Sequence, residues 1–244
     1  MLQLIVAFTL LGSIGALVGA ALFLVFPEAM RRSLLPYLVS YAIGTLLGSA
    51  FLCLIPAGLE KASSRLFMAI MLGGFVAFFL LEMLLLQRHS LAHERGGRSS
   101  PGLMVLIGDA FHNFVDGVVI AAAFMTSTSL GITVALTVIA HEIPQEIGEF
   151  AILLDNGFSR LKAFLLNALS ATAALPGAVL AYLWLGNTQS IVPFMLAISA
   201  ASFVYVASVD LIPTLHRDVK RRPPVGQIVL LIAGIGTIAI VSLF

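Results

Sequence analysis

The sequence has little charge and almost no cysteine. Only 10% of its 244 residues are charged, whereas soluble domains carry about 25%. This composition, together with 60% hydrophobic residues, excludes an ordinary soluble domain. The single cysteine, Cys53, excludes an internal disulfide and a cysteine-based metal site. No basic cluster predicts nucleic-acid binding, because the basic residues follow a membrane topology instead.

The hydrophobic residues lie in long runs. A run of about 20 apolar residues is enough for a helix to cross a bilayer. Eight such segments follow one another: Leu2–Phe26, Tyr37–Leu59, Leu66–Leu86, Leu103–Met125, Leu130–Leu154, Ala163–Leu185, Ile191–Pro213 and Val225–Phe244. The sequence therefore predicts an all-α integral membrane protein with eight transmembrane helices, a single transmembrane domain over residues 1–244 embedded in the lipid bilayer. The first segment has no basic stretch before it, so we expect a retained span rather than a cleaved signal.

The basic residues predict how the chain is oriented. If the N-terminus lies outside, the outer side keeps only Lys61 and Arg65. The loops on the cytoplasmic side then hold Arg31, Arg32, Arg88, Arg95, Arg98, Arg160, Lys162, Arg217, Lys220, Arg221 and Arg222. The positive-inside rule therefore predicts that both termini lie outside, with a cytoplasmic loop at about 87–101.

Ionisable residues inside the membrane concentrate in two segments. The fourth segment contains GDAFHNFVDG, and the fifth contains HEIPQEIGEF. Each such residue costs roughly 2.5–3.5 kcal/mol on insertion scales, so it predicts a functional site. Helical periodicity places the polar residues of each segment on one stripe. The short connection Thr126–Ser129 predicts that the two stripes lie side by side, and Pro144 predicts a bend in the fifth helix.

The chemistry of the two stripes indicates a divalent cation. Imidazole and carboxylate together suit Zn²⁺ and related ions such as Fe²⁺, Mn²⁺ or Cd²⁺. Neither segment has a lysine or arginine near its centre, although buried carboxylates need a positive partner. We therefore expect the cation itself to be the missing counter-charge.

At these residues the sequence resembles the ZIP (Zrt/Irt-like) family of divalent-metal transporters. HNFVDG and HEIPQEIGEF are similar to the family's two signature stretches, and the eight segments match its topology. The resemblance implies a ZIP-like helical bundle with a metal site between helices four and five. It also implies transport of divalent metals toward the cytoplasm by alternating access, with zinc as the main substrate and iron, manganese or cadmium as further candidates. A homodimer in the plasma (cell inner) membrane is expected, with the metal as substrate and no cofactor.

The resemblance also implies the ligands. One metal would be held by His112, Asp116, His141 and Gln145, and a second by Asn113, Asp116 and Glu142, with Asp116 bridging the two. Many relatives have His or Glu where this chain has Gln145. Some relatives add a carboxylate from the sixth segment, where this chain offers only Asn167, Ser170 and Thr172.

Further polar residues are candidates for a transport pathway. Asp109, Glu146 and Glu149 lie on the cytoplasmic side of the expected site, and His89 and His93 fall in the predicted cytoplasmic loop. A separate feature, the tripeptide Leu-Ile-Pro, ends both the second and the seventh segments, as an inverted repeat would.

Two other functions use the same residues. An intramembrane zinc metalloprotease is the main alternative, because HEIPQ begins like the His-Glu-x-x-His motif. The fifth position of that motif is Gln145, however, which removes the second histidine ligand. A proton-coupled carrier of organic solutes would need a cationic or aromatic recognition group that these stripes lack. The sequence therefore favours a transporter rather than an enzyme.

Overall fold

The structure is a computed structural model that describes residues 1–94, 101–185, 189–213, 215 and 224–243. The helices in chain order are α1 (Leu2–Val25), α2 (Glu28–Gly48), η1 (Ser49–Leu54), α3 (Ile55–Leu59), α4 (Ser64–Glu94), α5 (Pro101–Thr126), α6 (Thr128–Asp155), α7 (Arg160–Ala171), α8 (Ala174–Leu185), η2 (Gln189–Ile191), α9 (Val192–Tyr205), η3 (Val206–Leu211) and α11 (Val225–Val241). No strand occurs in these described ranges. The predicted all-α fold is confirmed.

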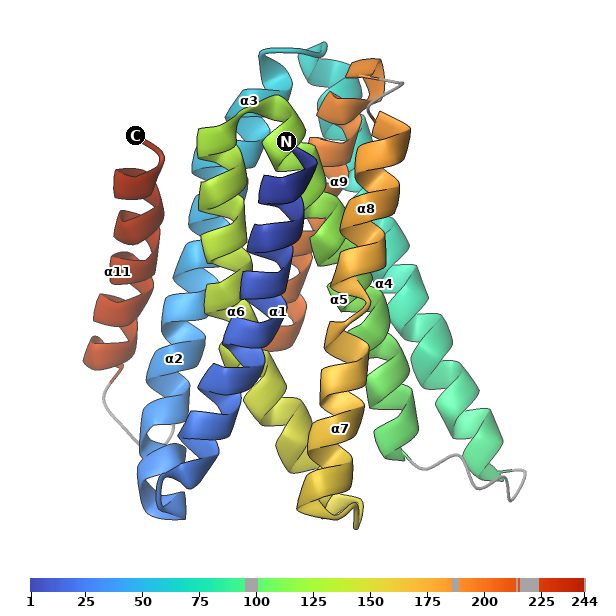
Figure 1. The fold of residues 1–244 in the computed structure, drawn as a ribbon, viewed down its shortest axis with the longest axis vertical. Coiled ribbons are helices and arrows are strands. Elements are labelled where there is room, and N and C mark those ends of the chain that lie inside the picture. The colour runs from blue at the N-terminus through green and yellow to red at the C-terminus, as the bar shows by residue number, and fades with distance from the viewer. Residues whose placement is uncertain (95–100, 186–188, 214, 216–223, 244) are drawn as a thin grey trace.

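Each of the eight predicted segments coincides with one helix or with consecutive helices (Figure 1). Six described stretches are long and apolar enough to cross a membrane: Leu2–Phe23, Ala29–Leu59, Ser64–Leu84, Leu106–Thr126, Arg160–Trp184 and Val192–Val209. The other two segments correspond to α6, which carries the polar stripe, and to α11, which has 17 residues. The number of eight membrane crossings therefore stays a prediction.

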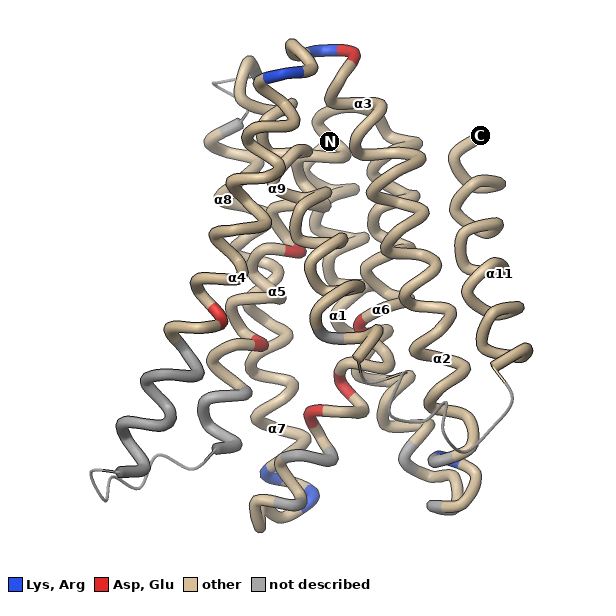
Figure 2. The backbone as a smooth tube through the Cα atoms, turned by 180° about the vertical axis from the view of Figure 1, so that it is seen from behind, with Lys and Arg blue, Asp and Glu red and all other residues tan. Residues whose placement is uncertain are grey.

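The start of α1 and the end of α11 lie at the same end of the bundle (Figure 1). The described Lys and Arg residues lie near the two ends, whereas Asp and Glu also occur at intermediate heights on α5 and α6 (Figure 2). Lys61 and Arg65 lie at the end with the termini, at the connection from α3 to α4. Six of the basic residues used to predict orientation fall in 95–100 and 216–223, outside the described residues. The outside location of the termini stays a prediction.

Helix α4 is longer than predicted. It continues to Glu94, and α5 begins at Pro101, so most of the segment 87–101 that was predicted as a loop is helical. His89 and His93 consequently lie in α4 rather than in a loop. Their side chains lie outside the described part of the structure.

The helices pack in two groups. Helix α2 packs along α11 and α4 along α9, while α5 packs along α8 and α6, and α1 along α6. Glycines bring backbones together within each group: a side chain at Gly234 would meet the Tyr41 carbonyl oxygen, and one at Gly117 would meet that of Ala174. The groups meet where α2 contacts α6 and where α9 contacts α5.

The repeated Leu-Ile-Pro tripeptide marks a repeated structure. Both η1 and η3 are π-helices of six residues, and each ends at the leucine of its tripeptide. Proline has no N–H to donate to the helical ladder, so the preceding turn widens. The second and seventh predicted segments thus share a local irregularity as well as three residues.

Candidate metal site

The polar stripes of α5 and α6 lie side by side. Helix α5 ends at Thr126 and α6 begins at Thr128, so a single residue, Ser127, separates them. The Ser127 hydroxyl accepts a hydrogen bond of 3.1 Å from the Leu130 backbone N–H at the start of α6. Farther along, α6 contains Pro144 and bends along its length (Figure 1). The predicted hairpin and bend are both confirmed.

Four side chains converge in the middle of this pair. His112 and Asp116 come from α5, and His141 and Glu142 come from α6; their ligand atoms all lie within 4.8 Å of one another. His112 Nε2 is 3.2 Å from His141 Nε2, 3.4 Å from Glu142 Oε1 and 3.8 Å from Asp116 Oδ2. His141 Nε2 is 3.2 Å from Asp116 Oδ2 and 3.6 Å from Glu142 Oε1.

These separations match a tetrahedral zinc site. A tetrahedral zinc ion about 2.0–2.1 Å from each of four ligand atoms holds those atoms about 3.3 Å apart. Five of the six separations lie between 3.2 and 3.8 Å, and all six are within 4.8 Å. The side chains are therefore arranged closely enough to bind one divalent ion without rearrangement of the helices.

The cluster is buried, and among the described residues its carboxylates pair with histidine alone. Asp116 and Glu142 are only 1% and 2% exposed. Both oxygens of Asp116, and Oε1 of Glu142, have no hydrogen-bond partner among the described residues. In the same part of the chain, their ion pairs are with histidine and not with lysine or arginine. A buried carboxylate of this kind is stabilised when a cation binds.

Two residues that the sequence analysis missed orient His141. Its Nδ1 lies 3.0 Å from the Thr137 carbonyl oxygen, an acceptor that favours a proton on Nδ1 and leaves the Nε2 lone pair for a metal. The ring of Phe203 in α9 packs edge-on against the imidazole, with 5.7 Å between centroids. Thr137 precedes His141 by four residues and was detectable from helical spacing, whereas no sequence signal connects Phe203 to this site.

The two predicted amide ligands point their nitrogens toward other carboxylates. Asn113 donates to Asp109 Oδ1 at 2.9 Å and to the Asp109 carbonyl at 3.2 Å. Gln145 donates to Glu149 Oε1 at 3.3 Å and to Asp109 Oδ1 at 3.5 Å. The structure therefore groups Asn113 and Gln145 with Asp109 and Glu149, and their metal contacts stay predictions.

Helix α7 contributes an amide in place of a carboxylate. Asn167 donates to Glu146 Oε2 at 2.7 Å and to the Glu146 carbonyl at 3.3 Å. Ser170 and Thr172 donate to backbone carbonyls of their own helix. Asn167 thus makes a hydrogen bond to a predicted pathway residue, Glu146, and Ser170 also interacts with a second one, Asp109.

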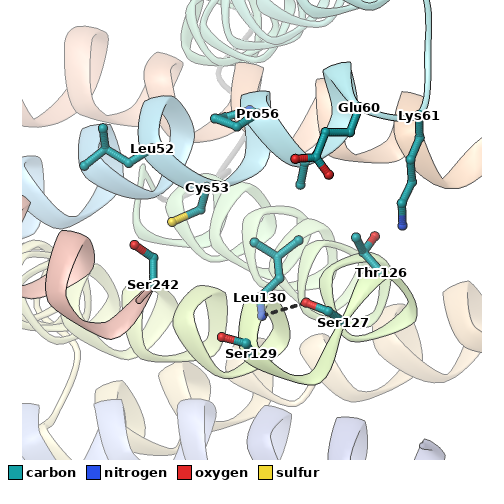
Figure 3. Close-up of a pocket in the computed structure, with 11 residues that line it drawn as sticks. Leu52, Cys53, Pro56, Glu60, Lys61, Thr126, Ser127, Ser129, Leu130 and Ser242 are labelled. Atoms are coloured by element: carbon teal, nitrogen blue, oxygen red, sulfur yellow. Dashed lines mark hydrogen bonds between the residues drawn. The ribbon is translucent and has the colours of Figure 1, made fainter. Parts of the chain in front are cut away.

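A pocket of about 450 Å³ lies away from the cluster, at the end with the termini. Its lining comes from η1 and α3, from the connection between α5 and α6, and from Ser242 after α11 (Figure 3). Cys53 is buried and contributes its sulfur to this wall. None of the predicted metal ligands lines this pocket. Within the metal cluster itself, His141 is fully buried, whereas the His112 side chain is 15% exposed.

Comparisons with known proteins agree with these motifs. Residues 87–242 match the sequence profile of the family described as ZIP zinc transporter. Zinc transporter ZIP13 of Pongo abelii is 32% identical over 225 residues, covering 86% of this chain and 67% of the relative. Zinc transporter ZIP10 of Danio rerio is 37% identical over 155 residues, covering 61% of this chain and 18% of the relative. Zinc transporter ZIP4 of Homo sapiens is 40% identical over 120 residues, covering 49% and 18%.

The chain spans less than a fifth of the length of the ZIP10 and ZIP4 relatives, and about two thirds of ZIP13. The profile nevertheless covers α5 and α6 completely, including both polar stripes and all four residues of the metal cluster. From this match, and from the extent of the similarity to ZIP13, the chain belongs to the ZIP zinc transporter family.

Proposed function

We propose that this protein transports divalent metal ions, zinc in particular, across a membrane toward the cytoplasm. The observation that carries the proposal is the cluster of His112, Asp116, His141 and Glu142. Its ligand atoms lie close enough to share one zinc ion, and its carboxylates lack a lysine or arginine partner in the described structure. The relatives named above are zinc transporters, which supports zinc as the substrate.

Alternating access would expose the cluster to each side in turn. The group with α1, α5, α6, α7 and α8 carries the metal ligands, and the group with α2, α4, α9 and α11 packs mainly within itself. Such packing is suited to one group sliding against the other as a unit. The burial of His141 and Asp116 supports a step in which the site is closed to both sides.

The carboxylates beyond the cluster are suited to an exit path. Asp109, Glu146 and Glu149 are buried, and helical spacing places them on the side of the cluster away from the termini. Under the predicted orientation this is the cytoplasmic side. His89 and His93 of α4 would follow them, and we retain both as proposed pathway residues.

A second metal next to the first is also part of the proposal. Asp116 would bridge the two ions, with Asn113 and Glu142 as further ligands of the second and Gln145 as a further ligand of the first. The two unpartnered oxygens of Asp116 support bridging, because each oxygen can bind one ion. The homodimer, the plasma-membrane location and transport of iron, manganese or cadmium rest on the family resemblance.

The metalloprotease alternative receives no support from the relatives, which are named as transporters. Hydrolysis would also need a water-accessible metal site. Three of the four cluster residues are at most 2% exposed, which does not favour that chemistry.

The test is metal uptake by liposomes that contain the purified protein. We expect wild-type protein to move Zn²⁺ and Cd²⁺, and His141→Ala to lower the flux by about tenfold or more, because a ligand is lost. Glu60→Gln, a change at the far end of the molecule, is the control and should retain flux. Full flux in the double variant His112→Ala, His141→Ala would overturn the site assignment.

A further inference from the structure

A second group of oxygen ligands lies beside the histidine cluster. The Gln145 amide nitrogen lies 3.5 Å from Asp109 Oδ1 and 3.3 Å from Glu149 Oε1, so it bridges a carboxylate of α5 and one of α6. The two carboxyl groups also interact with each other. The bridging amide nitrogen therefore occupies the place between two acidic groups where a cation would be most strongly stabilised.

No described lysine or arginine compensates the charge of this pair, although Asp109 interacts with the Ser170 hydroxyl and with Glu149 through hydrogen bonds. Asp109 is 3% exposed and Glu149 is 9% exposed. Asp109 Oδ2 and Glu149 Oε2 have no hydrogen-bond partner within the described ranges, and no described lysine or arginine forms an ion pair with either group. The amide hydrogens of Gln145 and Asn113 carry only partial positive charge. Two buried carboxylates with free lone pairs thus need a stronger positive partner than the neutral amides.

The position of the group connects it to the histidine cluster. Gln145 lies four residues after His141 and four before Glu149, one helical turn from each. Asp109 lies one turn before His112 on α5. An ion that leaves the cluster along these two helices therefore meets Asp109, Gln145 and Glu149 next.

We propose that Asp109, Gln145 and Glu149 form a second divalent-cation site, built from oxygen ligands alone, that receives the ion from the histidine cluster. The proposal rests on the transport function proposed above. Rotation of the Gln145 amide exchanges its nitrogen and oxygen, so the group that now donates to both carboxylates becomes a third oxygen ligand. The free second oxygens of Asp109 and Glu149 allow each carboxylate to bind in a bidentate manner.

The histidine cluster and the oxygen site are expected to prefer different metal ions, because their ligand atoms differ. Imidazole nitrogen suits zinc, whereas carboxylate and amide oxygens suit harder ions such as Mn²⁺, Mg²⁺ and Ca²⁺. A zinc ion is consequently held less tightly at Asp109, Gln145 and Glu149 than at the histidine cluster. Weaker binding at the second position favours release of the ion toward the proposed exit.

The experiment measures Mn²⁺ binding to the purified full chain at equilibrium, with free Mn²⁺ followed by its electron paramagnetic resonance signal. We expect the double variant Asp109→Asn, Glu149→Gln to weaken Mn²⁺ binding by about tenfold or more. An affinity within about threefold of wild type in Asp109→Asn, Glu149→Gln would overturn the proposal. Wild-type protein that binds no Mn²⁺ at millimolar concentration would overturn it as well.

Substitutions of Gln145 test the site without removing its carboxylates. Gln145→Glu adds a charged oxygen ligand and should tighten Mn²⁺ binding by about tenfold, whereas Gln145→Leu should weaken it. Glu60→Gln, which removes a carboxylate at the far end, is the matched control and should leave the Mn²⁺ affinity unchanged. An unchanged Mn²⁺ affinity in Gln145→Glu would contradict the proposal. The measurement requires no flux, so its failure is separate from a failure of metal transport.

Discussion

His141 shows how a ligand is prepared at the scale of one residue. Its own helix supplies the Thr137 carbonyl for Nδ1, and α9 supplies the ring of Phe203 against one side of the imidazole. Both contacts restrict the ring before a metal arrives, so less conformational entropy is lost on binding. The adjacent Glu142 is held less firmly, because its Oε1 has no hydrogen-bond partner in the described structure.

Substitution of Gln145 is expected to change the affinity of the protein for zinc relative to Mn²⁺. The substitution Gln145→His would place a nitrogen ligand one turn from His141 and remove the amide group that bridges Asp109 and Glu149. We expect zinc to bind about tenfold more tightly and Mn²⁺ less tightly, because imidazole is the softer ligand. Competition titrations of both ions on the same preparation measure this change. Gln227→His in α11, also a buried glutamine, is the control, and an equal shift in both variants would contradict the prediction.

At the scale of elements, α5 links the metal cluster to the neighbouring helices of its group. It carries His112 and Asp116, and it packs closely along α8, where Gly117 faces the Ala174 backbone and Gly177 faces Phe114. Only hydrogen at these positions lets the two backbones come so close. The close contact at Gly117 thus fixes the distance between α5 and α8 directly beside Asp116, a proposed metal ligand.

Gly117→Ala should separate α5 from α8. The added methyl group has no room at the Ala174 carbonyl, so we expect a loss of about 1–3 kcal/mol in the free energy of unfolding and a lower melting temperature in detergent. Gly108→Ala on the same helix is the control, because nothing lies within 4 Å of a side chain there. It should leave the melting temperature unchanged or slightly higher. Equal melting temperatures for the two variants would show that this contact is not tight.

At the scale of the whole molecule, the proposed direction of transport depends on which end of the bundle faces outside. The first residues of α1, the end of α11 and the connection from α3 to α4 all lie at one end, and the connection from α6 to α7 lies at the other (Figure 1). The positive-inside rule assigns the first end to the outside.

Cysteine labelling tests this assignment. In a Cys53→Ser background, we expect Ser63→Cys, between α3 and α4, to react with a membrane-impermeant maleimide on intact cells. Ser159→Cys, between α6 and α7, should react only after permeabilisation, because it lies at the opposite end. Labelling of Ser159→Cys alone on intact cells would reverse the predicted orientation and, with it, the proposed direction of transport.

The sequence was sufficient to predict those features of the fold and the site that depend on residue spacing along one helix. Hydrophobic runs predicted the helices, and the spacing of His112 to Asp116 and of His141 to Glu142 predicted which side chains share a stripe. The one-residue connection brought the two stripes together. The cluster contains His112, Asp116 and His141 of the first predicted ligand set, but its fourth member is Glu142 instead of the predicted Gln145. The end of α4 was not predictable, because a polar stretch such as 87–94 can continue a helix when its preceding turns are already formed.

By itself, then, the sequence determined that the chain is helical, that its polar residues gather between α5 and α6, and that a divalent cation suits them. These properties follow from composition and periodicity, which are local. Only the tertiary structure decided that Phe203 packs on His141, that Asn167 binds Glu146, and that Gln145 bridges Asp109 and Glu149. Such contacts depend on the rotation and distance of packed helices, which side-chain volume and close glycine contacts set and which no spacing along the chain encodes.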